Sequence, residues 1–262
     1  MTKRKMMIAL LVSIMMFTLP ACDLDVGGIG GAGDESGAVP VSDPYASLSP
    51  DVGKVLSTIE SDYSKIRWGV IYPLSEQYPG VVVSISPYDT DPYHYLAVAV
   101  TNVHSVEVTF TGSMEAKADD CSVIGMGSFY EEHLGPGQTR ISLLYCGTDK
   151  LPDGRIHWSD VQIKKAEDDR YIPWEADWSL SKSPGYRSAK AELAVTGDGG
   201  DPHLKKVDGL LIDDKGFILS GAEAYVYDIK PQEGRISTEL EFYDTEHALE
   251  RISDMAVFAN CR

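Results

Sequence analysis

The segment Leu96–Phe110 reads Leu-Ala-Val-Ala-Val-Thr-Asn-Val-His-Ser-Val-Glu-Val-Thr-Phe, and its pattern decides the fold. Large apolar residues occupy every second position in both halves of the segment: Leu96, Val98 and Val100, then Val106, Val108 and Phe110. A period of two places successive side chains on opposite faces of a β-strand. The segment therefore predicts two neighbouring strands.

The same alternation recurs further along the chain, with turn residues between the runs. Two more runs of this kind are Ile141, Leu143 and Tyr145, and Ile236, Thr238, Leu240 and Phe242. Leu-Gly-Pro-Gly at 134–137 has the composition of a turn between strands. Several short strands at this spacing predict an all-β sandwich.

The chain also contains an internal repeat at an offset of 95 residues. Nine of the 44 positions from Ala99 to Ser142 carry the same residue 95 positions later. The longest matches are Ala99-Val100-Thr101 with Ala194-Val195-Thr196, and Arg140-Ile141-Ser142 with Arg235-Ile236-Ser237. This period is too long for a solenoid and suits a sandwich of about 100 residues. We therefore expect two tandem immunoglobulin-like sandwiches, at 80–167 and 168–262.

The first 22 residues have the pattern of an export signal. Lys3, Arg4 and Lys5 precede an apolar run from Met6 to Leu19, which is too short to span a bilayer comfortably. The run ends in Leu-Pro-Ala-Cys at 19–22, which resembles the lipobox of bacterial lipoproteins. That resemblance implies a signal peptide at 1–21, a lipid on Cys22 and attachment to the outer face of the cell membrane. The alternative is a plain secretory signal with an incidental cysteine.

A tether and one helix are expected between the signal and the sandwiches. Residues 22–48 are rich in glycine and aspartate and offer little to bury, which predicts a flexible tether. Within 49–79, Ser49 and Pro50 suit the N-cap and the first helical position. An apolar stripe follows at helical spacing: Val52, Val55, Leu56, Ile59, Tyr63 and Ile66. We expect this short amphipathic helix to pack on the first sandwich.

The charge of the chain excludes one class of partner. The formal net charge is −17 at pH 7. Binding to nucleic acid relies on clustered lysine and arginine, so a nucleic-acid partner is not expected. We interpret the acidity as the solvated surface of an exported protein.

Three cysteines remain once Cys22 is assigned to the lipid. Cys121 and Cys146 lie on segments that we expect to be neighbouring strands, and disulfides persist outside the cytoplasm. We therefore expect a disulfide between Cys121 and Cys146, with Cys261 as a free thiol near the C-terminus. An intermolecular disulfide through Cys261 is the alternative.

The sequence carries no familiar catalytic motif. It has no Gly-x-Ser-x-Gly, phosphate loop, His-Glu-x-x-His or Cys-x-x-Cys, and its six histidines lack the spacing of metal ligands. We expect a non-enzymatic protein without cofactor or metal. Two alternatives stay open: an enzyme with a site assembled from distant positions, and a calcium site among Asp198, Asp201, Asp208, Asp213 and Asp214.

Aromatic residues give the best indication of binding. Four of them lie near the boundary of the two copies: Trp158, Tyr171, Trp174 and Trp178. Exposed Trp and Tyr stack on sugars and anchor protein interfaces, but they also fill cores and interdomain seams. We expect a spacer or protein-interaction module that meets a surface protein or a glycan. The alternative is a lipoprotein that binds carbohydrate or another small ligand through these four residues.

Both copies contain a strand, tight turn and strand of one recognisable type. The stretches are 98–102, 123–129 and 134–139 in the first copy, and Leu-Ile-Asp-Asp-Lys-Gly-Phe-Ile-Leu-Ser-Gly at 211–221 in the second. They resemble the FxLYD-type immunoglobulin-like domain of bacterial surface lipoproteins. The resemblance implies a lipoprotein with tandem sandwiches and implies no catalytic residues.

Overall fold

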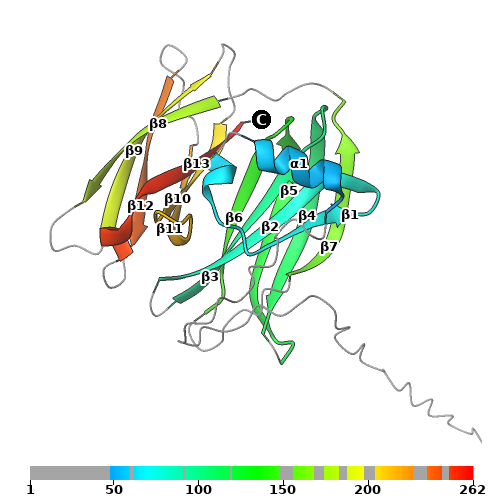
Figure 1. The fold of residues 1–262 in the computed structure, drawn as a ribbon, viewed down its shortest axis with the longest axis horizontal. Helices are drawn as coiled ribbons and strands as arrows, with labels where there is room; N and C mark the ends of the chain where they lie inside the picture. Colours follow the sequence, from blue (N-terminus) through cyan, green and yellow to red (C-terminus); the bar gives the residue numbers. More distant parts are fainter. Residues whose placement is uncertain are drawn as a thin grey trace, which may run out of the picture.

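The computed structural model confirms the all-β fold class (Figure 1). It describes residues 48–59, 62–90, 93–118, 120–147, 156–167, 174–182, 188–197, 204–226, 235–243 and 248–261. In these ranges the chain forms thirteen strands, one α-helix and two 3₁₀-helices. The predicted signal peptide and nearly all of the tether, including Cys22, lie outside the described residues.

Sheets A and B form the first sandwich. Sheet A has the strand order β1-β2-β3-β6, and sheet B has the order β5-β4-β7. The strands are β1 Val70–Ser75, β2 Tyr78–Thr90, β3 Tyr93–Asn102, β4 Val108–Lys117, β5 Val123–Leu134, β6 Thr139–Tyr145 and β7 Ile156–Lys165. The first sandwich therefore begins with β1, ahead of the boundary predicted at Gly80, because β1 pairs along β2.

Sheets C and D form the second sandwich. Sheet C has the order β12-β9-β8, and sheet D has the order β11-β10-β13. The strands are β8 Trp174–Lys182, β9 Ser188–Gly197, β10 Leu204–Ile212, β11 Ile218–Tyr225, β12 Arg235–Tyr243 and β13 Asp254–Cys261, with a 3₁₀-helix η2 at Ala248–Arg251.

The two sandwiches share one topology. Strands β2-β3-β6 of sheet A correspond to β8-β9-β12 of sheet C, and β5-β4-β7 correspond to β11-β10-β13. In sheet B, Met114 pairs with Gly127, and 95 residues later Gly209 pairs with Ala222. The sequence repeat is thus a repeat of strand order, with β1 as an addition to the first copy.

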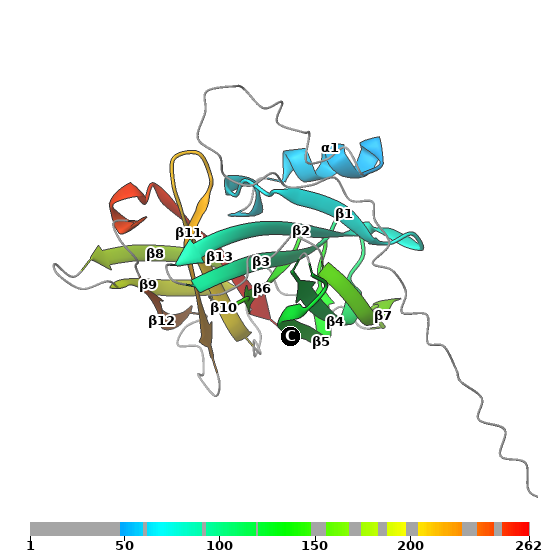
Figure 2. The same cartoon turned by 90° about the horizontal axis from the view of Figure 1, so that it is seen from below.

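Buried side chains form three layers. One lies between sheets A and B, and a second between sheets C and D. The third lies between the outer face of sheet A and the outer face of sheet D, where Ile141 and Tyr88 meet Leu210 and Phe258. Strand β10 is accordingly buried on both faces from Val207 to Ile212. Figure 2 shows the two sandwiches side by side, with the helix lying over sheet A.

The predicted helix is shorter than its apolar stripe. Helix α1 spans Pro50–Thr58, where the Ser49 hydroxyl accepts a hydrogen bond from the Val52 amide at 3.5 Å. A separate 3₁₀-helix, η1, follows at Asp62–Lys65. It touches the second sandwich, because an Asp62 carboxylate oxygen accepts from the Val257 amide at 2.9 Å. No helix of the described chain is long and apolar enough to cross a membrane.

Candidate functional site at the junction of the two sandwiches

The sandwiches touch where β11 of sheet D lies against sheet A. Figures 1 and 2 both show β11 beside the end of β2. A Cβ atom built on Gly221 would lie 2.8 Å from the Tyr88 hydroxyl and 2.9 Å from a methyl carbon of Leu143. Only a residue without a side chain allows this close approach. Burial at the contact raises the pKa of Tyr88 above its ordinary value.

Four tyrosines extend from this contact along sheet A, and we call them the tyrosine cluster: Tyr88, Tyr93, Tyr95 and Tyr145. Tyr88 pairs with Tyr95 across β2 and β3, and Tyr95 pairs with Tyr145 across β3 and β6, so all three share one face. The rings of Tyr88 and Tyr95 stack with centroids 5.2 Å apart. Tyr145 meets Tyr95 and Tyr93 edge-on, each at 5.5 Å. Tyr93 is 42% exposed and Tyr145 is 49% exposed.

A second group of polar residues extends from the same contact along sheet D, and we call it the charge cluster: Lys206, Asp208, Glu223 and Tyr225. Asp208 pairs with Glu223, and Lys206 pairs with Tyr225, on the two rows that follow the Gly221 row. The Lys206 ammonium lies 2.9 Å from an Asp208 carboxylate oxygen and 2.6 Å from a Glu223 carboxylate oxygen. It also lies 5.8 Å from the centre of the Tyr225 ring.

The electrostatics of the charge cluster follow from burial. Asp208 is fully buried, and burial raises its pKa to about 6, although the Lys206 cation opposes the shift. Burial by itself would lower the pKa of Lys206, but Asp208 and Glu223 outweigh it, so that pKa is raised. The lysine therefore stays cationic, and its charge is compensated within the protein.

Exposure increases along both clusters away from the contact. On sheet A it rises from buried Tyr88 to half-exposed Tyr145, and on sheet D from buried Asp208 to Tyr225, which is 54% exposed. We call the outer residues of the two clusters, Tyr93, Tyr145, Glu223 and Tyr225, the junction face. Exposed aromatic rings and carboxylates commonly contact ligands in binding sites. The junction face is therefore the candidate binding site.

The aromatic residues predicted from sequence are placed elsewhere. Trp158 faces the interior of the first sandwich, where its ring stacks on Phe129 and meets Phe110 edge-on. Trp178 packs on the core of the second sandwich. Strands β7 and β8, which carry them, lie at opposite ends of the molecule (Figures 1 and 2), so the structure does not bring these two residues together. Tyr171 and the side chain of Trp174 lie outside the described residues.

Sequence reasoning missed the junction tyrosines, although a signal was present. Tyr93 and Tyr95 are two residues apart, which places both on one face of a strand. Tyr225 is the repeat counterpart of Tyr130, yet the two have different neighbours because only Tyr225 lies beside the other sandwich. The neighbours of each tyrosine depend on how the two copies pack against each other, and the sequence repeat does not predict that packing.

The predicted disulfide between Cys121 and Cys146 is wrong. Cys146 carries a free, buried thiol that donates to the Leu144 carbonyl at 3.7 Å and lies against Gly125. Cys121 lies in the exposed turn after β4, with φ of 64°. One sulfur therefore points into the core while the other residue is at the surface. The side chain of Cys261 lies outside the described residues.

Two of the aspartates proposed for a calcium site, Asp208 and Asp213, have structural roles, and Asp214 is exposed in a turn. Asp208 is held by Lys206. A carboxylate oxygen of Asp213 accepts from the amides of Lys215 and Phe217, both at 2.9 Å, and closes the turn around Gly216. Asp198 and Asp201 lie outside the described residues. Among the described side chains, no group of three His, Cys, Asp or Glu is arranged to hold a metal ion.

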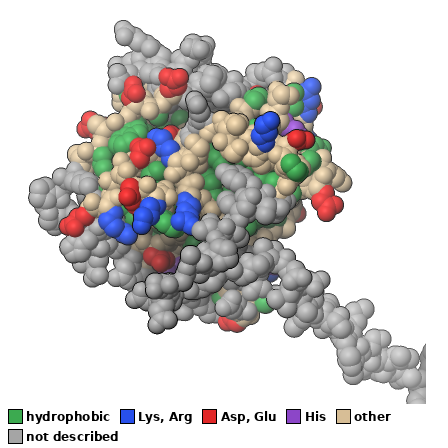
Figure 3. All heavy atoms as spheres, viewed as in Figure 1, with side chains coloured by type: hydrophobic (Ala, Val, Ile, Leu, Met, Phe, Trp, Pro, Cys, Tyr) green, Lys and Arg blue, Asp and Glu red, His purple; other side chains and the backbone are tan. Residues whose placement is uncertain are grey.

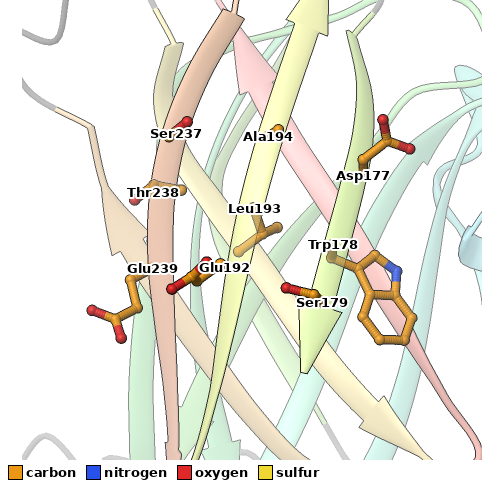
Figure 4. Close-up of a pocket in the computed structure, with 9 residues that line it drawn as sticks. All are labelled: Asp177, Trp178, Ser179, Glu192, Leu193, Ala194, Ser237, Thr238 and Glu239. Carbon is orange, nitrogen blue, oxygen red and sulfur yellow. The ribbon is translucent and has the colours of Figure 1, made fainter. Parts of the chain in front are cut away.

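A second surface feature is a shallow depression of about 590 Å³ on sheet C (Figure 4). Two outward-facing rows cross its three strands: Asp177, Ala194 and Ser237, and Ser179, Glu192 and Glu239. The three carboxylates are exposed to solvent. On the face shown in Figure 3, the acidic and basic side chains of the described residues are interspersed.

Comparison with known proteins assigns no family to the chain. No family model and no curated protein matches it. Twenty-four solved chains resemble it. One is red sea bream transglutaminase, with 12% identity and a TM-score of 0.23, over 68% of this chain and 29% of that chain. The chain thus spans less than a third of that protein, and a likeness this weak indicates nothing about activity.

Proposed function

We propose that this protein is a non-enzymatic, lipid-anchored surface lipoprotein of the FxLYD-like type, whose two immunoglobulin-like sandwiches hold the junction face as a binding surface. The lipobox-like sequence ending in Cys22 and the glycine-rich segment after it support the anchor. The observation that carries the binding role is the exposure of three tyrosine rings, Tyr93, Tyr145 and Tyr225, beside the contact between the sandwiches.

The third buried layer supports a role as a spacer. Ile212, Ile218 and Phe258 of the second copy are buried with Ile66 and Trp68 of the first. Domains that share an apolar interface move less relative to each other than domains joined by a linker alone. A pair of sandwiches fixed in this way would keep the junction face in one geometry at the cell surface.

The anchor is tested by replacing the proposed lipid site. Cys22→Ser should move the protein from the membrane fraction to the soluble fraction or leave it unprocessed, because no thiol remains for the lipid. Fractionation and N-terminal mass spectrometry of wild type and variant give the readout. A mature N-terminus without a lipid at a residue other than Cys22 would contradict the anchor.

The binding role is tested by cross-linking on intact cells. The double variant Tyr145→Ala/Tyr225→Ala should lose the adducts that the wild type forms, since it removes aromatic area from both sandwiches. Tyr130→Ala is the matched control, because Tyr130 is the repeat counterpart of Tyr225 and is 72% exposed on sheet B. Equal adducts in both variants would contradict a binding role for the junction face.

A further inference from the structure

We propose that the junction face binds a neutral glycan, with the Tyr145 and Tyr225 rings stacking on sugar rings and Glu223 accepting hydrogen bonds from sugar hydroxyls. This inference rests on the proposed function, since it names the partner of the same surface.

The aromatic part of the surface suits the apolar faces of a sugar. Tyr145 and Tyr225 leave about half of their surface exposed, and they come from sheets A and D respectively. Tyr145 is held by edge contacts with Tyr93 and Tyr95, so its ring is positioned before any ligand arrives. A ring fixed in advance loses little conformational freedom on binding.

The polar part suits hydroxyl groups. Glu223 is 39% exposed at its side chain and directs one carboxylate oxygen to Lys206. An ionised carboxylate accepts at several lone-pair positions, so Glu223 can accept from a ligand hydroxyl while it keeps the Lys206 ammonium and its hydrogen bond with Tyr225. Tyr225 stands across from Lys206 on the adjoining strand, and the oxygen of its phenol can accept a further hydrogen bond from a ligand.

The charges favour a neutral ligand over an ionic one. Lys206 is the cation of the cluster and contacts two carboxylates, so its charge is not available to an anionic ligand. The net charge of −17 further disfavours anionic glycans. A cationic ligand would compete with Lys206, whose ammonium already lies near the Tyr225 ring. An uncharged, polyhydroxylated ligand does not need the charge of Lys206 and does not compete with it.

The test uses the purified mature chain on an array of immobilised neutral oligosaccharides, with sulfated and sialylated glycans as the anionic comparison. We expect retention of neutral glycans, followed by calorimetry with the best-retained one. Tyr225→Ala should weaken its affinity about tenfold, which corresponds to one well-made contact. Glu223→Gln keeps the shape of the side chain and should weaken it several-fold. Tyr130→Ala should leave it unchanged, and thermal melting establishes that each variant is folded.

Each other outcome has a defined meaning. The inference is overturned if the array retains no neutral glycan or if it retains anionic glycans preferentially. It is also overturned if neither Tyr225→Ala nor Glu223→Gln changes the affinity for the neutral glycan. If no glycan binds but Tyr145→Ala/Tyr225→Ala still removes adducts on cells, the partner is a protein and the proposed binding role stands. If that double variant changes neither readout, the proposed role of the junction face fails with the inference.

Discussion

The indole Nε1 of Trp158 donates a hydrogen bond of 3.0 Å to the hydroxyl of Tyr72, which joins the last strand of the first sandwich to its first strand. Burial raises the pKa of Tyr72 to about 12, so its hydroxyl stays neutral over the physiological range. Together with the stacking on Phe129, the bond makes Trp158 a packing residue that closes the open side of the sandwich.

Trp158→Ala should therefore destabilise the protein. We expect a loss of about 3 kcal/mol in the free energy of unfolding, at the low end for a large aromatic because Trp158 is only partly buried. Trp158→Phe keeps most of the ring contacts and loses the hydrogen bond to Tyr72, which should cost about 1 kcal/mol. Urea denaturation measures both, and Tyr130→Ala is the exposed control. A Trp158→Ala protein of wild-type stability would restore Trp158 as a binding candidate.

The contact at Gly221 should tolerate no side chain. Gly221→Val would place methyl groups where the Tyr88 hydroxyl and Leu143 now lie, so the sandwiches would have to separate or shift. We expect a loss of about 2 kcal/mol, typical of overpacking. The matched control is Ser237→Val, which adds comparable bulk at an exposed strand position. Thermal melting compares the two, and equal melting temperatures would argue against a close junction.

The fold was predictable from sequence because alternation and an internal repeat are local signals. Leu240 and Phe242 alternate along β12, and both point into the second core. Which neighbouring sheet covers an apolar face was harder to predict. Ile141 and Leu143 also alternate, yet they pack between the sandwiches rather than inside the first one. Their pattern reports a buried face and does not specify which neighbour buries it.

The candidate site was less predictable for the same reason. Tryptophan often anchors interfaces, which makes Trp158 a candidate from sequence, but its side of β7 faces a core. Lys206 and Asp208 are ordinary charged residues in sequence, and their burial comes from sheet A covering sheet D. Cys146 shows the limit most clearly, since sequence gives its neighbours along the strand but not the direction of its sulfur.

Cys146 should react slowly with alkylating reagents in the folded protein. Burial raises the pKa of its thiol to about 11, so little thiolate forms at pH 8, and the sulfur is also shielded from reagent. Peptide mapping after iodoacetamide treatment should show Cys146 modified in urea and largely unmodified in buffer. A Cys121–Cys146 peptide in a non-reduced digest would contradict the structure.

The buried carboxylate of Asp208 should make stability depend on pH between about 4 and 6. Its pKa in the folded protein is raised to about 6, whereas an exposed aspartate titrates near 3.9, so the folded state binds the proton more strongly. The stabilising contribution is then fully present below about pH 4 and is lost as the pH rises through 6. The loss should amount to about 2–3 kcal/mol in the wild type.

Asp208→Asn, which cannot titrate, should remove this dependence, and Glu192→Gln, on the exposed face of sheet C, should retain it. Urea denaturation from pH 4 to 7 measures all three proteins. Parallel pH profiles for wild type and Asp208→Asn would mean that Lys206 keeps Asp208 ionised throughout this range.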